Sequence, residues 1–439
     1  MPVVALTVRP DLFALHASNP ARYPVLLEST GAEGWDILLA CPMEAEYFSW
    51  AQADQFFACL NSQWQATHRP TPAEAAHLPF RGGWFMYLAY ELLQVFEPSV
   101  QAQPAENNNF PLAVLMRIPA AVLHDRTQGV TWLFAEQAED VLTMQQDLSK
   151  IQFPCYPTAK LDSLIEETDA LYLAAVKAAK TYIRAGDAFQ VNLSRRWHGH
   201  LAEQVSPQSV YHALRTHNPA PFSGIAQFGL DHAIVSSSPE YLFRRTGDHI
   251  STRPIAGTFA RIADQQQDKL QREALRTHPK ERAEHVMLVD LERNDLGRVC
   301  QPGSVQVDEL MGVSTYAHVH HIESTVSGQL RPDISPYALL RALFPGGTIT
   351  GCPKVRTMQI IRELESGPRG AYTGSMGYLN LDGDMLLNIL IRSMTISGSS
   401  LTFSAGAGIV ADSEPERELA ETRAKAKGLL RALGIETWS

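Results

Sequence analysis

The stretch Ala405-Gly406-Ala407-Gly408-Ile409-Val410-Ala411-Asp412-Ser413, continued by residues 414–425, is the starting point for predicting this fold. Its first half consists of small residues, so a ligand can lie directly against the backbone there. Its second half predicts a helix, because Asp412 or Ser413 is a suitable N-cap residue and Pro415 suits the first turn. The order of these features predicts a glycine loop that leads directly into a helix.

The predicted helix carries charged side chains on one face. Glu418, Glu421 and Lys425 recur at i, i+3 and i+7, a spacing that places the three side chains together. A glycine loop beside such carboxylates suits a ligand that carries an anion and binds together with a hard cation. The alternative is that Glu421 and Lys425 form an ordinary ion pair, one turn apart, on the helix surface.

A second acidic pair repeats this spacing earlier in the chain. Glu281 and Glu284 lie within residues 268–291, a segment that we predict to be one long helix. Two helices with two carboxylates each can hold one Mg²⁺ ion, which prefers oxygen ligands and keeps positions open for an anionic substrate. The alternative is that each pair only lies on a solvated helix face, where this spacing is common.

Glu240 is a candidate general acid. It follows Ser236-Ser237-Ser238-Pro239, where a predicted strand ends in a turn. A carboxyl group in such a turn can donate a proton if burial raises its pKa toward neutral pH. The alternative is a solvated turn residue. Residues 253–258 follow as a predicted tight turn of small residues between two strands.

A glycine-rich segment, residues 344–354, opens another predicted helix. Backbone N–H groups at a helix N-terminus, with Thr348 and Lys354 beside them, are typical of an anion site, and the spacing of a P-loop is absent. Three further side chains can bind a carboxylate or donate hydrogen bonds, although each is more often structural when considered alone: Arg392, His321 and Tyr372.

The bulk composition excludes several classes of function. The chain has 439 residues, 45% of them apolar, and a net charge of −10, so it can form a large core and has no basic field for nucleic acid. No apolar run is long enough to span a membrane, and the first residues do not resemble a signal peptide. The five cysteines are scattered, which favours a reducing compartment, and we expect a cytoplasmic protein.

The order of predicted elements indicates an α+β body built on sheets, since many strands alternate with a few long helices. Residues 112–123 and 385–397 are each predicted to form one strand. Residues 153–163 contain two prolines and no periodicity, so we place a boundary there. It separates an N-terminal α/β region, residues 1–155, from a second region, residues 165–439.

Six motifs follow one another along the chain: Gly186-Asp187-Ala188-Phe189-Gln190-Val191-Asn192-Leu193-Ser194, Ser238-Pro239-Glu240-Tyr241-Leu242, Arg253-Pro254-Ile255-Ala256-Gly257-Thr258 and residues 290–297, 347–354 and 405–413. Together and in this order they resemble the motifs of the chorismate-utilising enzymes, which include anthranilate synthase component I, aminodeoxychorismate synthase component I, isochorismate synthase and salicylate synthase. The resemblance implies the fold of anthranilate synthase component I, a large two-sheet β-sandwich with helices packed outside. Residues 165–439 would form its chorismate-binding catalytic domain, and the first 150 residues match more loosely, through residues 26–29 and 82–90.

The resemblance implies a role for each candidate residue. Glu240 would protonate the departing C4 hydroxyl of chorismate, and Arg392 with Tyr372 would face its enolpyruvyl carboxylate. The other catalytic positions, beside the ring, would be Ala256, Gly257, Thr258 and His321. The substrate would also be held by Thr348, Ala405, Gly406, Gly408 and Lys425. A Mg²⁺ cofactor, which would grip the ring carboxylate, would be bound by Glu281, Glu284, Glu418 and Glu421.

Within the family, two motifs resemble aminodeoxychorismate synthase more than anthranilate synthase: the one that contains Asn192 and the one that contains Cys352. The predicted reaction is therefore the conversion of chorismate and ammonia to 4-amino-4-deoxychorismate, for p-aminobenzoate and folate synthesis. Many such enzymes carry a lysine where this chain has Ala256, and a methyl group cannot act as a nucleophile. Anthranilate formation is therefore the alternative, and a non-catalytic ligand-binding relative is the second alternative.

The resemblance also implies a partner and a second small-molecule site. No Cys-His amidotransferase segment is visible, so ammonia would come from a separate glutamine amidotransferase subunit, docked on the N-terminal region as a heterodimer. Leu27, Glu28 and Ser29 resemble the lining of a tryptophan pocket in this family.

Overall fold

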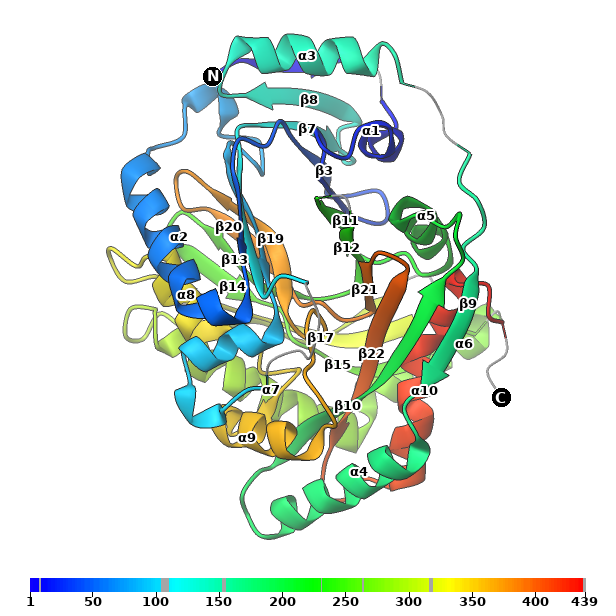
Figure 1. Cartoon of the computed structure of the whole chain (residues 1–439). Coiled ribbons are helices and arrows are strands. Elements are labelled where there is room, and N and C mark those ends of the chain that lie inside the picture. Colours follow the sequence, from blue (N-terminus) through cyan, green and yellow to red (C-terminus); the bar gives the residue numbers. More distant parts are fainter. Residues whose placement is uncertain are drawn as a thin grey trace.

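The body of the protein consists of two antiparallel sheets with helices outside them (Figure 1). The computed structural model describes residues 1–7, 9–103, 110–151, 155–229, 231–262, 264–315 and 319–436. Across these residues one sheet has twelve strands and the other has ten. The predicted α+β fold, a two-sheet sandwich with helices outside, is confirmed.

The twelve-stranded sheet combines the first strands of the chain with the last. Its strand order along the main path is β1 (Val3–Leu6), β8 (Val130–Ala135), β7 (Ala120–Asp125), β3 (Trp35–Ala40), β2 (Val25–Glu28), β11 (Phe222–Phe228), β12 (His232–Ser238), β21 (Ser393–Ser397), β22 (Ser400–Ile409), β10 (Gln190–Leu201) and β18 (Gly351–Cys352), with β9 (Leu161–Glu166) also paired to β10.

The ten-stranded sheet likewise combines strands from the first and the later parts of the chain. Its main path is β15 (Ile255–Ala260), β17 (Val319–Gln329), β14 (His249–Thr252), β13 (Tyr241–Thr246), β20 (Met385–Asn388), β19 (Ser375–Asn380), β5 (Gly83–Leu88), β6 (Ala113–Ile118) and β4 (Ala45–Phe48), with β16 (Gln306–Thr315) paired to β17.

Helices cover the outer faces of both sheets. The twelve-stranded sheet packs against α1 (Leu12–Ser18), α3 (Ala138–Leu148), α5 (Pro207–His217) and α10 (Pro415–Ala432). The ten-stranded sheet packs against α2 (Ala53–Thr67), α7 (Pro279–Gly297) and α8 (Pro336–Leu343), and α6 (Gln265–Thr277) contacts its β15 edge. Two further helices pack on β10 and β22: α4 (Asp169–Arg184) and α9 (Lys354–Leu364). Short 3-10 helices occur at Trp50–Gln52, Ala73–Ala75, Tyr90–Val95 and Pro98–Val100.

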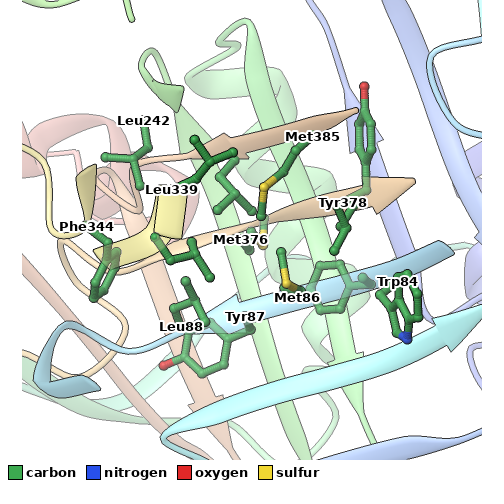
Figure 2. Close-up of a cluster of buried hydrophobic side chains, with 14 of the residues drawn as sticks. Trp84, Met86, Tyr87, Leu88, Leu242, Leu339, Phe344, Met376, Tyr378 and Met385 are labelled. Carbon is green, nitrogen blue, oxygen red and sulfur yellow. The ribbon is translucent and has the colours of Figure 1, made fainter. Parts of the chain in front are cut away.

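The main core lies where strands of the ten-stranded sheet are covered on both faces. All six residues of β5 are buried, which explains why its sequence is a continuous apolar run rather than an alternating one. Figure 2 shows side chains of this strand, among them Trp84 and Tyr87, in one buried cluster with side chains of β19; Tyr87 pairs with Met376 across the two strands. Each large apolar side chain removed from water in this way stabilises the fold by about 1.5–3 kcal/mol.

Two segments that were each predicted as one strand form two strands instead, and in both cases the two strands belong to different sheets. Residues 112–123 divide at Pro119 into β6 and β7, because proline lacks the N–H that a continuous ladder needs. Residues 385–397 divide into β20 and β21, and Arg392 between them has a positive φ of 54°. Both segments therefore cross from one sheet to the other, so the prediction of single strands was wrong.

Two predicted helical features also differ from the structure. The helix predicted for residues 268–291 is interrupted at His278 and Pro279, which caps and opens the separate helix α7. Helix α10 does begin at Pro415, but its N-cap is Glu414, and the Ser413 hydroxyl instead accepts a hydrogen bond from the Val410 N–H.

Two predicted loops are strand. The predicted glycine loop at residues 405–409 is the end of β22, and the predicted tight turn at residues 253–258 leads into β15. Strand β15 carries a bulge at Gly257, whose positive φ of 62° suits glycine.

The two predicted regions of the chain share both sheets. Strand β2 pairs with β11, and β5 pairs with β19, so N-terminal strands continue the sheets of the second region. Residues 153 and 154 of the predicted boundary lie outside the described residues. Within the described part of the chain, we find no helix with the length and apolarity that a bilayer span would need.

Candidate functional site

The candidate site lies in the lower half of Figure 1, where β15, β17, β10 and β22 run between α7 and α10. At its centre is Glu240, which is only 5% exposed and follows the end of β12. The Thr348 hydroxyl donates a hydrogen bond of 2.9 Å to Oε1 of Glu240. Burial is the main cause that raises the pKa of Glu240 to about 8. The nearby Glu292 carboxylate also raises this pKa, whereas the hydrogen bond from Thr348 lowers it. Glu240 is therefore a protonated acid at neutral pH, as proton donation requires.

Arg392 faces this acid from the link between β20 and β21. Its positive charge interacts with Glu240, and burial lowers the pKa of the guanidinium group. Its backbone has a φ of 54°, a left-handed conformation that is uncommon for residues other than glycine. The Arg392 carbonyl accepts a hydrogen bond of 3.1 Å from the Ser237 N–H, which ties the link to β12. Backbone strain of this kind is frequent where a side chain must be aimed at a ligand.

His321 lies on β17 and is 2% exposed. Its backbone is paired with Thr258 of β15, and its Nδ1 lies 3.4 Å from the Gly257 carbonyl oxygen. Burial, together with the positive charges of Arg392 and Lys425, lowers the pKa of His321 to about 3. The imidazole is therefore neutral. Arg392 and Lys425 lie near enough to His321 to lower its pKa, and His321 contacts Gly257, so these residues belong to one site.

The glycines of β22 allow close packing at the site. A Cβ atom on Gly406 would lie 2.8 Å from the Tyr372 hydroxyl, and one on Gly408 would lie 2.1 Å from Nε2 of Gln190. Side chains alternate along a strand, and Ala405 accordingly packs in the core on the helix side of the sheet. The face occupied by the two glycines is therefore the face that Tyr372 and Gln190 approach.

Tyr372 and Lys425 border this glycine face. Tyr372 is 8% exposed, and burial raises the pKa of its hydroxyl above the usual value. The ammonium group of Lys425 donates a hydrogen bond of 3.0 Å to the Gly406 carbonyl and lies 2.8 Å from Glu421. The predicted ion pair between Glu421 and Lys425 therefore exists, and it lies at the edge of the site.

Each of the two acidic helix pairs has one member beside a candidate site residue: Glu281 lies by Gly257, and Glu421 pairs with Lys425. Oε2 of Glu281 lies 3.0 Å from the position that a Cβ on Gly257 would take, and Glu418 is 6% exposed. Glu284 follows Glu281 by one turn of α7, and Glu421 follows Glu418 on α10. Among the described residues, no group of three or more His, Cys, Asp or Glu side chains is close enough to share a metal ion. The side chains of both pairs end in carboxylate oxygens, the kind of ligand that Mg²⁺ prefers.

Two acidic residues of α7 received no role from the sequence. Glu292 is 7% exposed, and burial raises its pKa to about 7. Asp295 forms an ion pair with Lys354, so this lysine, expected at an anion site, is already neutralised by a carboxylate. A signal was present in the sequence, because Glu292 recurs with the apolar Val289 and Leu296 on one helix face.

The three residues predicted to line a tryptophan pocket, Leu27, Glu28 and Ser29, lie in the lining of a separate cavity of about 460 Å³. The Glu28 carboxylate accepts hydrogen bonds of 2.6 Å from the Tyr211 hydroxyl and the Arg215 guanidinium, both on α5. Glu28 is therefore held in place from the outside of the sheet.

Comparison with known proteins bears on this arrangement. A profile of the family described as chorismate binding enzyme matches residues 22–431. The chain belongs to this family. It is 41% identical over 384 residues to an anthranilate synthase component I-like protein from Synechocystis, covering 87% of this chain and 79% of the relative. It is 38% identical over 369 residues to aminodeoxychorismate synthase component 1 from Bacillus subtilis, covering 81% and 78%.

A solved member of the family has the same fold. The anthranilate synthase component I from Streptococcus pneumoniae superposes with a TM-score of 0.80 at 31% identity, covering 92% of this chain and 93% of that one. The resemblance found in the motifs is thus confirmed, and the protein is a chorismate-converting enzyme of the group that makes anthranilate, aminodeoxychorismate or isochorismate.

Proposed function

We propose that this protein is component I of an aminodeoxychorismate synthase, converting chorismate and ammonia to 4-amino-4-deoxychorismate, the precursor of p-aminobenzoate and folate. The observation that carries its chemistry is the buried, protonated Glu240, held by Thr348 and faced by Arg392. Chorismate loses its C4 hydroxyl as water only if that oxygen is protonated, and Glu240 is the acid available for this step. Arg392 matches a planar carboxylate, so it would bind the enolpyruvyl carboxylate together with Tyr372.

The remaining residues would bind and orient the ring. Thr348, Gly406, Gly408 and Lys425 would hold the substrate, and the neutral His321 would lie beside the leaving group. Ala405 would support this strand from the core side. The small residues Ala256, Gly257 and Thr258 would leave room for a nucleophile; the side chain of Thr258 lies outside the described residues.

A Mg²⁺ ion would be held by the two acidic pairs, Glu281 with Glu284 and Glu418 with Glu421, whose oxygen donors suit it. When bound, it would offset the negative charge of the ring carboxylate. Chelation should therefore abolish chorismate consumption, and added Mg²⁺ should restore it. Full activity after exhaustive chelation would refute the proposed metal.

The choice of product rests on the sequence around Asn192 and Cys352 and is supported by the aminodeoxychorismate synthase relative. A specific observation favours anthranilate as the second candidate. Ala256 offers no nucleophile, so the amine must reach C4 without a covalent enzyme adduct. Incubating the purified chain with chorismate, Mg²⁺ and ammonium, followed by chromatography, separates the two. Fluorescent anthranilate formed without an added lyase would overturn the proposed product.

Ammonia would come from a glutamine amidotransferase subunit, since the relatives are named as component I or component 1. We keep the N-terminal region, residues 1–155, as the proposed docking region. Glutamine should support turnover only when that subunit is added. Hydrolysis of glutamine by this chain alone would contradict the proposed partner. Absence of any turnover with ammonium would favour a ligand-binding relative without catalysis.

A further inference from the structure

Glu292 is a buried acidic residue whose charge acts on Glu240, the proposed proton donor. It belongs to α7, and its Oε1 lies 3.3 Å from the position that a Cβ on Gly347 would occupy. The backbone N–H of Gly347 donates to this carboxylate. The Thr252 side chain is a second hydrogen-bond partner of this carboxylate. Because the Glu292 side chain is 7% exposed and interacts with the Gly347 backbone, it holds the turn that contains Gly347.

The turn that Glu292 contacts carries the hydrogen-bond donor of the acid. Thr348 directly follows Gly347, and its hydroxyl donates to Glu240 over 2.9 Å. A continuous series of contacts thus runs from Glu292 through Gly347 and Thr348 to Glu240. A displacement of this turn would remove the partner that orients the acid.

The charges around both carboxylates can be named. Glu240 is faced by Glu292 of α7, Glu323 of β17 and Arg392. Glu292 is faced by Asp295 of its own helix and by Lys354 of α9. Lys354 is already paired with Asp295, so it offsets the charge of Glu292 only in part. A negative Glu292 repels a negative Glu240 and so favours its protonated form.

We propose that Glu292 is a positioning residue for the proton donor: it holds the Gly347–Thr348 turn against Glu240, and its carboxyl group faces that acid from α7. The inference rests on the proposed role of Glu240 in chorismate turnover. It assigns a role to a residue of the motif at 290–297 that received none in the sequence analysis.

The test compares pH profiles of chorismate consumption, which is measured whichever product forms. Chorismate consumption is measured with ammonium and Mg²⁺ above and below about pH 8, which is close to the pKa of Glu240. The proteins compared are the wild type, Glu292→Gln and Glu292→Asp. A matched control is Asp290→Asn, because Asp290 lies on the same helix with a side chain that is 66% exposed. The ammonium–ammonia equilibrium affects all variants equally, so the differences between profiles isolate the enzyme.

We expect the alkaline loss of activity to move to lower pH by about half a unit or more in Glu292→Gln, since a like charge has been removed. Glu292→Asp, which keeps the charge, and Asp290→Asn should retain the wild-type limb. If circular dichroism shows that Glu292→Gln does not fold, Glu292→Ala serves for the same comparison. A limb that stays in place while activity falls at every pH would mean a structural role only and would overturn the inference. No chorismate consumption by the wild type would instead refute the proposed function itself.

Discussion

Replacing Glu240 by glutamine should remove activity and, at alkaline pH, stabilise the protein. The structure raises the pKa of this carboxyl from 4.5 to about 8. At roughly 1.4 kcal/mol per pKa unit, ionising Glu240 in the folded protein costs about 5 kcal/mol more than in the unfolded chain. This value is an upper limit for the variant, because glutamine also loses the attraction between the carboxylate and Arg392.

The sign of the effect follows from the direction of the shift. Below pH 4.5 Glu240 is protonated in both states, and it contributes no pH dependence. As the pH rises from 4.5 through 8, the unfolded chain releases this proton first, so the wild type loses stability over this window. Glu240→Gln has no proton to release and avoids that loss.

The assay is urea unfolding of the wild type and Glu240→Gln at acidic and alkaline pH, together with chorismate consumption. We expect the variant to be more stable by about 1–5 kcal/mol at alkaline pH, with little difference at acidic pH, and to lose at least about a hundredfold in rate. The exposed Glu203→Gln is the matched control and should change neither quantity. An unchanged pH dependence of stability in Glu240→Gln would refute the assignment of a buried, protonated acid.

Three further predictions follow from the geometry of the site. Gly406→Ala should destabilise the protein and reduce turnover, because the new Cβ would lie 2.8 Å from the Tyr372 hydroxyl. Thermal unfolding measures this loss, and Gly297→Ala is the control: Gly297 lies in a helix with open space around it, so this variant should be as stable as the wild type or more stable. Arg392→Lys should raise KM for chorismate by about tenfold or more in steady-state kinetics, since lysine cannot form the paired hydrogen bonds of a guanidinium; an unchanged KM would argue against carboxylate binding there. Tryptophan should raise the Tm of the wild type but not of Ser29→Phe, which fills part of the 460 Å³ cavity, and no rise in the wild type would remove the proposed tryptophan site.

Several local features of the chain could be predicted from the sequence, because residue type and spacing determine them. The acidic pairs at i, i+3, the proline that opens α10 and the turn that holds Glu240 could all be read in one dimension. The predictions failed where backbone direction depends on distant partners. Residues 112–123 and 385–397 each have the pattern of one continuous strand, yet each crosses between sheets, and a strand pattern does not show which sheet a strand joins.

Taken alone, the amino-acid sequence determined the family, the two-sheet α+β class and the identity of the charged candidates, since these depend on motifs and on periodicity. Only the tertiary structure decided which candidates share a site and in which protonation state. Nothing in the sequence distinguishes Glu240 and Glu292 from other carboxyl groups. The pKa of each is raised because strands and helices from remote parts of the chain exclude water from it. Desolvation is a property of the assembled fold, so no local pattern of residues contains it.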